Sequence, residues 1–400
     1  MLLHNKQVAI IGGGIGGLTL ARLLQLQNVN VKIYERDLNS EVRVQGSPLD
    51  LHEDSGLKAI KQAGLLEEFY ANIRPNASKA RIVDKDFQLH FDEHIYPENE
   101  LKNTSNSNKD SLQDISKPRP EIDRSVLRNI LLNSLLPETT VWNSQFLFME
   151  KENQGWKIHF ANGTQAYADL VIAADGANSK VRPYINTEKP IYSGITLIEG
   201  TIYNAEENAP KLFKFSKGGK VLSFGNEQTL MYGTKGDKSL MFLLSSKIPE
   251  DVISKDHLDL KDNTTVYEWF KSNYKDWSTE WDELFKAEEL YFIPRPQYYF
   301  SLNQTWETQK NIAMIGDAAH RMPPFAGKGA NLAMLDALEL SQYLTTESNY
   351  DIKTAISIFE KRMLERASKA TKDTLENSEQ LHSKDALQKL VSIFKNKTQS

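Results

Sequence analysis

The sequence contains no cysteine and no long uninterrupted run of apolar residues. The missing cysteine excludes disulfides, thiolate metal ligands, iron–sulfur clusters and cysteine nucleophiles. The apolar stretch over residues 8–20 is rich in glycine and ends before Arg22, which makes it too short to span a bilayer. Because no small-residue cleavage site follows it, we expect a cytoplasmic protein with no signal peptide and no membrane insertion.

Neither sign of charge is in large excess. Lysine and arginine total 48, aspartate and glutamate total 53, and the formal net charge is −5. This mild acidity gives no electrostatic reason to expect a nucleic-acid partner. Histidine, aspartate and glutamate do not cluster at the spacing of metal ligands, so we expect no metal site. The composition is that of an ordinary globular protein, and we expect a monomer that binds a small molecule.

Glycines are concentrated near the N-terminus, between two predicted strands. A β-branched strand is expected over residues 7–11, and it leads into the glycine-rich residues 12–17. A helix is predicted over 18–27 and a second strand over 29–33, which ends close to Glu35. This order of strand, glycine turn, helix, strand and acid is typical of dinucleotide-binding folds.

Each glycine of the fingerprint has a steric role. Gly12 permits the tight turn from strand to helix, Gly14 lets the backbone approach a pyrophosphate, and Gly17 allows close packing of helix on strand. The free N–H groups at the start of the helix can bind phosphates, and Glu35 can accept hydrogen bonds from ribose hydroxyls. The motif does not distinguish FAD from NAD, and a glycine turn without a ligand is the alternative.

Two further strands end in short polar motifs. An apolar strand over residues 169–174 is followed by Asp175–Gly176, which taken alone is an ordinary turn signal. Another over residues 311–315 is followed by Gly316–Asp317. In an α/β fold, ligands bind at the carboxyl ends of such strands.

A glycine-containing segment, residues 323–331, opens a helix predicted over residues 332–344. With Gly327 and Gly329 at its start, the N–H groups of this helix could face an electron-rich ligand. His320, just before the segment, is expected to be structural rather than an acid or base.

The middle of the chain is predicted to form an antiparallel sheet, because short alternating segments are separated there by glycine-containing turns. These strands are expected over residues 195–197, 212–215, 221–224 and 240–244. Residues 97–118 are expected to form a loop, and the residues from 351 onward show helical spacing.

The three motifs together resemble those of a known family. The glycine fingerprint, the Asp175–Gly176 pair and the G-D-A-A-H-x-x-P-P-x-x-G-x-G-x-N segment at residues 316–331 resemble the single-component flavoprotein aromatic hydroxylases, which have the para-hydroxybenzoate hydroxylase fold. The resemblance covers almost the whole chain. Further likeness to the tetracycline-modifying flavin monooxygenases lies at residues 34–37, 49–52, 121–124 and 322–327.

This resemblance implies an α/β fold with three parts. A Rossmann-like FAD-binding domain would comprise residues 1–185 and 290–345. An inserted antiparallel-sheet substrate domain would comprise residues 186–289, and a C-terminal bracing helical segment residues 350–400. The inserted sheet would form a roof over the flavin ring.

The resemblance also implies which residues bind FAD. The ADP half would lie at Gly12, Gly14, Ile15, Gly16, Gly17, Glu35 and Arg36. The flavin and its ribityl chain would contact Asp50, Arg124, Asp317, Gly327, Lys328, Gly329, Ala330 and Asn331. Asp175 matches a motif associated with the FAD pyrophosphate and NADPH, and Arg43 would contact NADPH. Lys328 stands where the family usually has glutamine.

For the substrate, the resemblance implies contacts with Pro324 and Phe325 and with the predicted sheet. Where the tetracycline-modifying enzymes are expected to have glutamine, arginine and histidine, this chain has Glu199, Lys220 and Met241. An ionised glutamate, a lysine without a planar fork and an apolar methionine recognise different groups.

The function implied is that of a monooxygenase. NADPH would reduce FAD, O₂ would give a C4a-hydroperoxide, and one oxygen atom would pass to a polycyclic or aromatic compound, with tetracycline as a candidate and antibiotic resistance as the result. The flavin supplies the chemistry, so no catalytic side chain is named. The alternatives are a flavin hydroxylase of an unrelated small aromatic metabolite and a non-catalytic FAD-binding protein. A flavin-dependent halogenase is disfavoured because its W-x-W-x-I-P run is absent.

Overall fold

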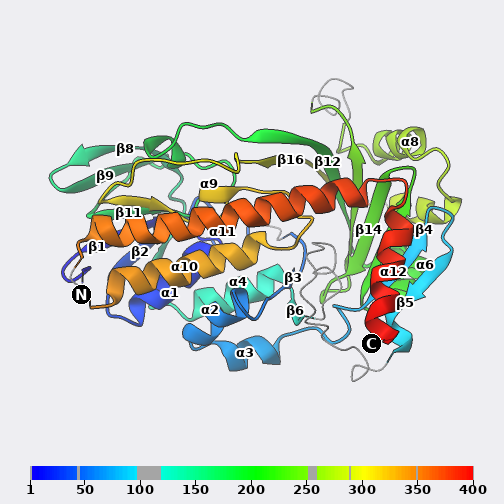
Figure 1. Ribbon diagram of the computed structural model, residues 1–400, viewed down its shortest axis with the longest axis horizontal. Helices are drawn as coiled ribbons and strands as arrows, with labels where there is room; N and C mark the ends of the chain where they lie inside the picture. The colour runs from blue at the N-terminus through cyan, green and yellow to red at the C-terminus, as the bar shows by residue number, and fades with distance from the viewer. Residues whose placement is uncertain are drawn as a thin grey trace. The chain divides into compact units, whose positions relative to one another are not determined.

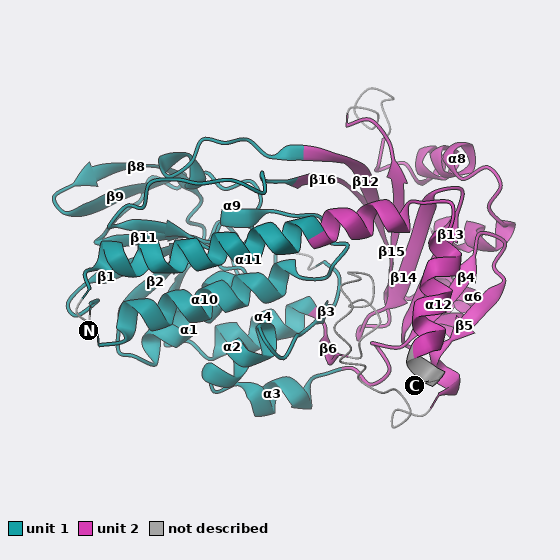
Figure 2. Cartoon of the chain, in the orientation of Figure 1, with its two compact units in different colours: residues 1–73, 124–191, 299–372 teal, residues 74–123, 192–298, 373–400 magenta. Residues whose placement is uncertain are grey.

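The structure is a computed structural model that describes residues 2–42, 46–96, 119–250, 259–287, 290–347 and 350–399. The chain divides into two compact units, shown in Figure 2. Unit 1 comprises residues 1–73, 124–191 and 299–372, and unit 2 comprises residues 74–123, 192–298 and 373–400. The three domains expected from the sequence have other bounds, and that division stays a prediction.

A parallel sheet forms the centre of unit 1, and among the described strands its order is β17-β11-β1-β2-β7. These strands are β1 (Gln7–Ile11), β2 (Asn30–Tyr34), β7 (Thr140–Val141), β11 (Leu170–Ala173) and β17 (Ile312–Met314). All residues of β11 and β17 are buried, as expected for a parallel sheet covered on both faces. The predicted α/β fold class, with a Rossmann-like part and an antiparallel sheet, is confirmed.

Helix α1 packs against this sheet, and a smaller antiparallel sheet also contacts it. The helices that lie wholly in unit 1 among the described residues are α1 (Ile15–Gln25), α2 (Gly56–Gln62), α3 (Leu66–Ala71), α4 (Arg124–Asn133), α9 (Asp317–His320) and α10 (Gly329–Thr345), with the short strand β3 (Leu49–Asp50) and the 3₁₀ turn η4 (Arg182–Tyr184). The smaller sheet has the order β10 (Gln165–Ala168), β9 (Gly155–Phe160), β8 (Phe146–Glu152). Helix α10 packs beside α1, far from it in sequence (Figure 1).

Helix α1 begins three residues earlier than the sequence predicts. Gly14 has an extended backbone and caps the helix, so Ile15 is already its first residue. The helix ends at Gln25, and Asn28 follows with a left-handed φ of +56°. The start of α1 therefore lies inside the glycine fingerprint, with its first N–H groups in the glycine turn.

Unit 2 is built on a larger sheet, with the order β16-β12-β15-β14-β13-β4-β5 among the described strands. They are β4 (Ala80–Asp84), β5 (Leu89–Asp92), β12 (Ile191–Ile202), β13 (Lys220–Gly225), β14 (Gln228–Thr234), β15 (Leu240–Lys247) and β16 (Leu290–Tyr299). The strands predicted at 195–197, 221–224 and 240–244 lie in β12, β13 and β15. Strand β14 was not predicted; it pairs antiparallel with β13 and β15, β12 pairs antiparallel with β15, and β13 pairs with β4 in parallel. Strand β16 lies at one edge, which suits Pro294 and Pro296 because proline donates no hydrogen bond.

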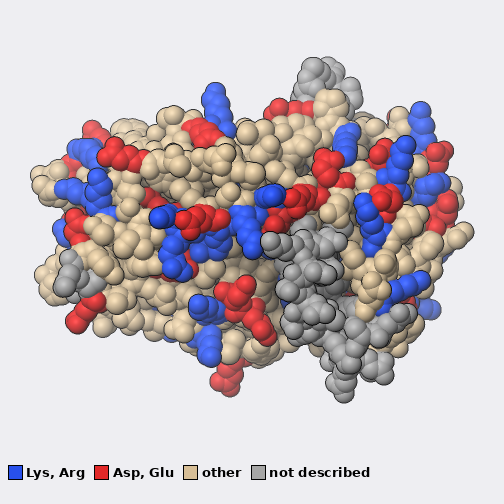
Figure 3. Space-filling model, in the orientation of Figure 1, with Lys and Arg blue, Asp and Glu red and all other residues tan. Residues whose placement is uncertain are grey.

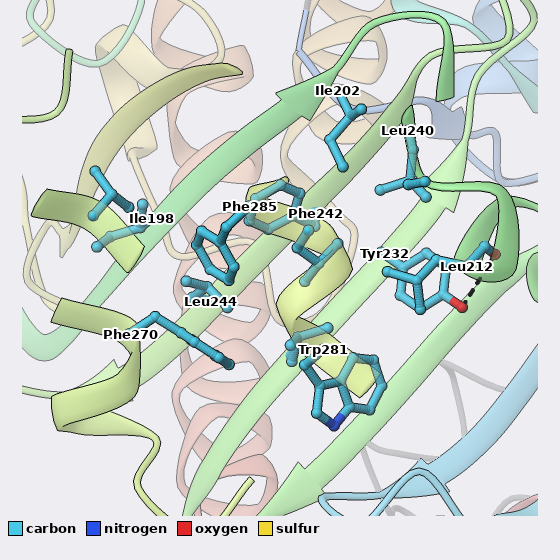
Figure 4. Packing of buried hydrophobic residues seen from close by; sticks show 14 of the residues in the cluster. Ile198, Ile202, Leu212, Tyr232, Leu240, Phe242, Leu244, Phe270, Trp281 and Phe285 are labelled. Atoms are coloured by element: carbon cyan, nitrogen blue, oxygen red, sulfur yellow. Dashed lines mark hydrogen bonds between the residues drawn. The ribbon is translucent and has the colours of Figure 1, made fainter. Parts of the chain in front are cut away.

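One face of this sheet carries the aromatic core of unit 2, seen in Figure 4. Phe242 from β15 and Tyr232 from β14 pack there against Trp281 and Phe285, and Tyr232 donates a hydrogen bond to the carbonyl of Leu212. The remaining elements of unit 2 are β6 (Glu121–Ile122), α5 (Ala205–Asn208), α6 (Pro210–Ser216), α8 (Asn263–Asn273), α12 (Ala386–Gln399) and the 3₁₀ turns η1 (Glu93–Ile95) and η5 (Thr279–Phe285). Buried residues of α5, α6, α8 and η5 belong to this core and cover that face of the sheet.

One predicted strand is wrong. Residues 212–215 were expected to alternate as a strand, but they lie in helix α6, which begins at Pro210. Proline favours the first turn of a helix, and Leu212 is the residue of this segment that is buried completely. The segment is too short for its apolar pattern to distinguish the two structures. The expected loop over residues 97–118 lies outside the described residues.

The C-terminal part is helical, as predicted. Helix α11 (Ile352–Leu381) precedes α12, and Ile356, Phe359 and Met363 are buried at helical spacing. None of the helices in the described ranges combines the length and apolar character needed to cross a bilayer. On the face seen in Figure 3, basic and acidic side chains are interspersed, in keeping with the small net charge.

Candidate cofactor and substrate sites

The glycine fingerprint has two crowded positions and one open position. A Cβ at Gly12, where φ is +108°, would lie 2.4 Å from the carbonyl oxygen of Ala174. A Cβ at Gly17 would lie 2.3 Å from the carbonyl oxygen of Gly12, whereas one at Gly14 would meet no atom within 4 Å. Gly12 and Gly17 are therefore required by the turn itself, and the open space at Gly14 is available to a ligand.

Glu35 joins the end of β2 to the fingerprint. Its buried carboxylate accepts hydrogen bonds from the N–H of Gly13 at 2.6 Å and from the N–H of Asp37 at 3.0 Å. Sequence reasoning missed Arg128, which donates to the carbonyl of Gly13 at 3.3 Å from helix α4. Among the other predicted residues of this region, Arg36 is exposed, and Arg43 lies outside the described residues.

The Gly316–Asp317 turn presents one polar side chain. Gly316 has a φ of +59°, and a Cβ there would lie 2.8 Å from the Cβ of Ala333 on α10. Asp317 is exposed, although its neighbours on both sides are buried. Since Asp317 begins α9 directly after β17, its carboxylate lies at the carboxyl end of the parallel sheet, where α/β folds bind ligands.

Asn331 brings three of the predicted flavin residues together. Its buried side-chain amide donates to the carbonyl oxygens of Asp50 at 2.8 Å and Gly327 at 3.4 Å, and its oxygen accepts from the N–H of His52 at 2.9 Å. A Cβ at Gly329 would lie 3.8 Å from the Asp317 carboxylate. The start of α10 thus gathers Asp50, Gly327, Gly329, Asn331 and Asp317.

The other predicted residues near this helix differ in exposure. Lys328 and Ala330 are half-buried beside Gly329, Phe325 is buried and Pro324 is exposed. Arg124 is half-buried at the start of α4. These residues keep their predicted roles as proposals.

Asp175 closes the turn after β11. One carboxylate oxygen accepts from the N–H of Lys180 at 2.8 Å, while the other is buried without a hydrogen-bond partner in the part of the chain that the structure describes. Burial raises the pKa of Asp175 despite these hydrogen bonds. A buried acceptor without a partner indicates a place for a donor from a ligand.

Arg182 binds the backbone of α9, a contact that the sequence did not predict. Its guanidinium donates to the carbonyl oxygens of Ala318 at 3.0 Å and Ala319 at 2.9 Å, and it stacks 3.5 Å from the centroid of Phe300. Burial lowers the pKa of Arg182 to about 10, so it stays a cation at neutral pH. No sequence pattern indicates a contact across more than a hundred residues.

In unit 2, the strand register places the three predicted substrate residues on one face of the sheet. Lys220 is paired with Gly233, Gly233 with Met241, and Met241 with Thr201, so these residues form one row. Glu199 lies two residues from Thr201 and thus on the same face. The aromatic core occupies the opposite face, where a Cβ at Gly200 would collide with the Phe242 ring.

Two of these residues already belong to ion pairs. The ammonium of Lys220 pairs with Glu121, and the carboxylate of Glu199 accepts a hydrogen bond from Nε of Arg295 on β16. Glu199 is 7% exposed, whereas the Arg295 side chain is 42% exposed. The terminal Nη groups of Arg295 have no hydrogen-bond partner among the described residues, so they could bind an anion. Sequence reasoning missed Arg295, because a single charge beside two prolines carries no pattern.

The described residues of unit 1 fit a flavin dinucleotide. Open backbone at Gly14 suits a pyrophosphate, and the exposed carboxylate of Asp317 suits ribityl hydroxyls. The carboxylate of Glu35 is buried and holds the Gly13 turn, so its ribose contact stays a prediction. The buried acceptor on Asp175 lies close by, because a Cβ at Gly12 would be 2.9 Å from the Asp175 Cα.

Comparison with known proteins agrees with this geometry. Residues 5–371 match the family model described as "FAD binding domain". Over 393 residues the chain is 28% identical to the monooxygenase asqM of Emericella nidulans, covering 84% of this chain and 83% of that protein. It is also 28% identical over 375 residues to the 6-methylsalicylate 1-monooxygenase atA of Aspergillus terreus, covering 84% and 74% respectively.

Among solved structures, the tetracycline destructase Tet(55) superposes with a TM-score of 0.74. The superposition covers 100% of this chain and 98% of that chain at 19% sequence identity. At this identity the similarity shows a shared fold.

We expect the variants Gly14→Val and Gly17→Val to fail in different ways. Valine at Gly14 meets open space, so the protein should fold but purify without FAD, because the side chain fills the position of the pyrophosphate. Valine at Gly17 collides with the Gly12 carbonyl and should prevent folding. Circular dichroism and flavin absorbance of the purified variants distinguish these results, and a Gly14→Val protein with a full complement of FAD would contradict the assignment.

We also expect Asp317→Ala to weaken FAD binding while the chain stays folded. Loss of a charged hydrogen-bond acceptor should raise the dissociation constant for FAD about 10- to 100-fold. Fluorescence titration of the apoprotein measures it. Glu67→Ala, which removes an exposed carboxylate on α3, is the control. Equal FAD affinity in the two variants would exclude Asp317 from the site.

Proposed function

The chain belongs to the FAD-binding-domain family and is an FAD-dependent monooxygenase, and we propose that it hydroxylates an anionic aromatic compound with NADPH as the reductant. The observation that carries this proposal is the family match over residues 5–371, which includes all three cofactor motifs and the sheet of unit 2. Support for an aromatic anion comes from a relative named for 6-methylsalicylate, which is an aromatic carboxylate.

In this proposal FAD would supply the chemistry, and the residues of the chain would hold the cofactor. Bound FAD would supply the redox chemistry, in which NADPH gives two electrons, one atom of O₂ enters the substrate as a hydroxyl and the other leaves as water. The chain would hold the cofactor through the backbone at Gly14 and the carboxylate of Asp317. The sequence has one dinucleotide fingerprint, so NADPH would bind without a Rossmann domain of its own.

The substrate surface would be the sheet face that carries Glu199, Met241 and Lys220. The opposite face is filled by the aromatic core and offers no room. On the proposed face, Glu199 holds Arg295 by its Nε atom and leaves the terminal Nη groups available. A guanidinium binds a carboxylate or phenolate in a fixed geometry, which favours an anionic aromatic substrate.

Tetracycline is the second candidate substrate. It is favoured by the sequence resemblance at residues 34–37, 49–52, 121–124 and 322–327. Glu199, Lys220 and Met241 argue for a different substrate, because they replace the polar residues expected in tetracycline-modifying enzymes. Both candidates share the cofactor chemistry and differ only in the compound that is hydroxylated.

A substrate panel tests the proposal. The holoenzyme with NADPH should oxidise the nucleotide faster with hydroxylated benzoates than with their neutral amides, and mass spectrometry should find a product heavier by one oxygen atom. Tetracycline in the same assay tests the second candidate. Flavin-loaded protein that oxidises NADPH with none of these compounds would contradict the proposed substrate class, and use of NADH alone would contradict the proposed reductant.

Arg295→Gln should act on anionic substrates selectively. Loss of the guanidinium should raise KM for a benzoate about 10- to 100-fold and leave kcat and the KM for a neutral aromatic compound nearly unchanged. The matched control is Lys271→Gln, because Lys271 pairs with Asp282 at 3.2 Å among the elements of the opposite face. An unchanged KM for every anionic substrate would remove Arg295 from the substrate site.

A further inference from the structure

A single side-chain oxygen on α10 holds both ends of the one-turn helix α9. Oδ2 of Asp336 accepts a hydrogen bond from the N–H of Gly316 at 3.0 Å and lies 2.5 Å from Nε2 of His320. Asp336 is completely buried, and His320 is 2% exposed. Asp317 lies between the two anchored residues, so the position of its exposed carboxylate depends on Asp336.

The second oxygen of Asp336 is held by another helix. Oδ1 accepts a hydrogen bond from Nη2 of Arg366 on α11 at 2.8 Å, and Nη1 of Arg366 binds Glu339 at 2.9 Å. These residues all belong to unit 1. A buried carboxylate is stable when cations and hydrogen-bond donors surround it, and here both oxygens are used.

The surrounding charges favour a protonated His320. Burial alone would lower the pKa of His320, but the charge and hydrogen bond of Asp336, with the charge of Asp317 in addition, raise it above the ordinary value. Burial would raise the pKa of Asp336, but His320 and Arg366 lower it. Among the described residues, the charged groups around α9 are Asp336 from α10, Arg366 from α11, Asp317 on α9 itself and Arg182, which donates to the carbonyl oxygens of Ala318 and Ala319. Nδ1 of His320 has no hydrogen-bond partner there.

We propose that Asp336 is a positioning residue for FAD, which fixes the Asp317 carboxylate through the Gly316 backbone and the His320 imidazole. The inference rests on the proposed role of Asp317 in holding the flavin. The alternative is a purely architectural role, in which Asp336 stabilises the packing of α9, α10 and α11 without changing the strength of FAD binding.

The first test is Asp336→Asn, which preserves shape. Asparagine has one acceptor oxygen and no charge, so it either loses the contacts to Gly316 and His320 or keeps them only as weaker neutral hydrogen bonds. The dissociation constant for FAD, measured by fluorescence titration of the apoprotein, should rise about 10- to 100-fold. The matched control is Glu339→Gln, because Glu339 binds the same arginine without touching α9, and its affinity should stay within about 2-fold of the wild type.

The second test follows the pH dependence of FAD binding from about pH 6 to about pH 9. Because the pKa of His320 is raised in the folded protein, its positive charge is fully present below about pH 6.5 and is lost as the pH rises through the folded value. Wild-type FAD affinity should therefore fall across this range. His320→Gln removes the titrating group, and its affinity should be weaker and flat with pH. This variant keeps the test valid if Asp336→Asn does not fold.

The outcomes distinguish failure of the proposed FAD site from failure of the proposed role of Asp336. A wild-type protein that takes up no FAD would overturn both the cofactor site and the role of Asp336. Wild-type binding with equal affinity in Asp336→Asn, or an equal pH profile in His320→Gln, would overturn only the positioning role. Lower thermal stability of Asp336→Asn with unchanged FAD affinity would establish the architectural alternative.

Discussion

The backbone of unit 1 turns at places where no Cβ can fit, and the rest of the cofactor region is arranged around these turns. Gly12 and Gly17 bring the end of β1, the start of α1 and Ala174 into contact. Helix α10 approaches both turns at one residue, because a Cβ at Gly16 would lie 3.1 Å and one at Gly316 2.8 Å from the Cβ of Ala333. The close approach of α10 therefore requires glycine at positions 16 and 316 and a small side chain at position 333. These contacts bring the ends of β1 and β17 to the same helix.

Charged groups in this region are buried where they support the backbone and exposed where a ligand could reach them. Glu35, Arg128 and Arg182 each bind backbone N–H or carbonyl groups of the turns. Such contacts offset the desolvation of a buried charge and leave little freedom to the loop that they hold. Asp317 differs from them, because its carboxylate is exposed among buried neighbours. This contrast distinguishes groups that shape the site from one that can bind within it.

The sequence predicted the local features and missed the long-range ones for a physical reason. The strands at 7–11, 169–174 and 311–315 and the helix at the end of the glycine-rich segment were recognisable, because spacing and glycine positions are local properties. Helix α6 was mistaken for a strand, since a short apolar run fits both structures. The contacts of Arg182, Arg295 and Asn331 join residues far apart in the chain, and no single-sequence pattern encodes which charge will meet which partner. Resemblance to a family supplied the candidate residues, but only the structure gives their neighbours.

The strands of unit 2 carry the buried core on one face of the sheet and polar side chains on the other. Along β12, Ile198 and Ile202 enter the aromatic core, while Glu199 and Thr201 face the other way, because side chains alternate. A substitution at 199 therefore changes the polar face without removing a core contact. The same holds at Lys220 and Met241, whose strand neighbours Val221 and Phe242 belong to the core. Glu199 is nevertheless constrained, because its buried carboxylate needs a cation, and Arg295 provides it. A change of substrate preference by mutation at Arg295 should therefore keep a hydrogen-bond donor for Glu199, since loss of every donor would leave a buried carboxylate unpaired and destabilise the fold.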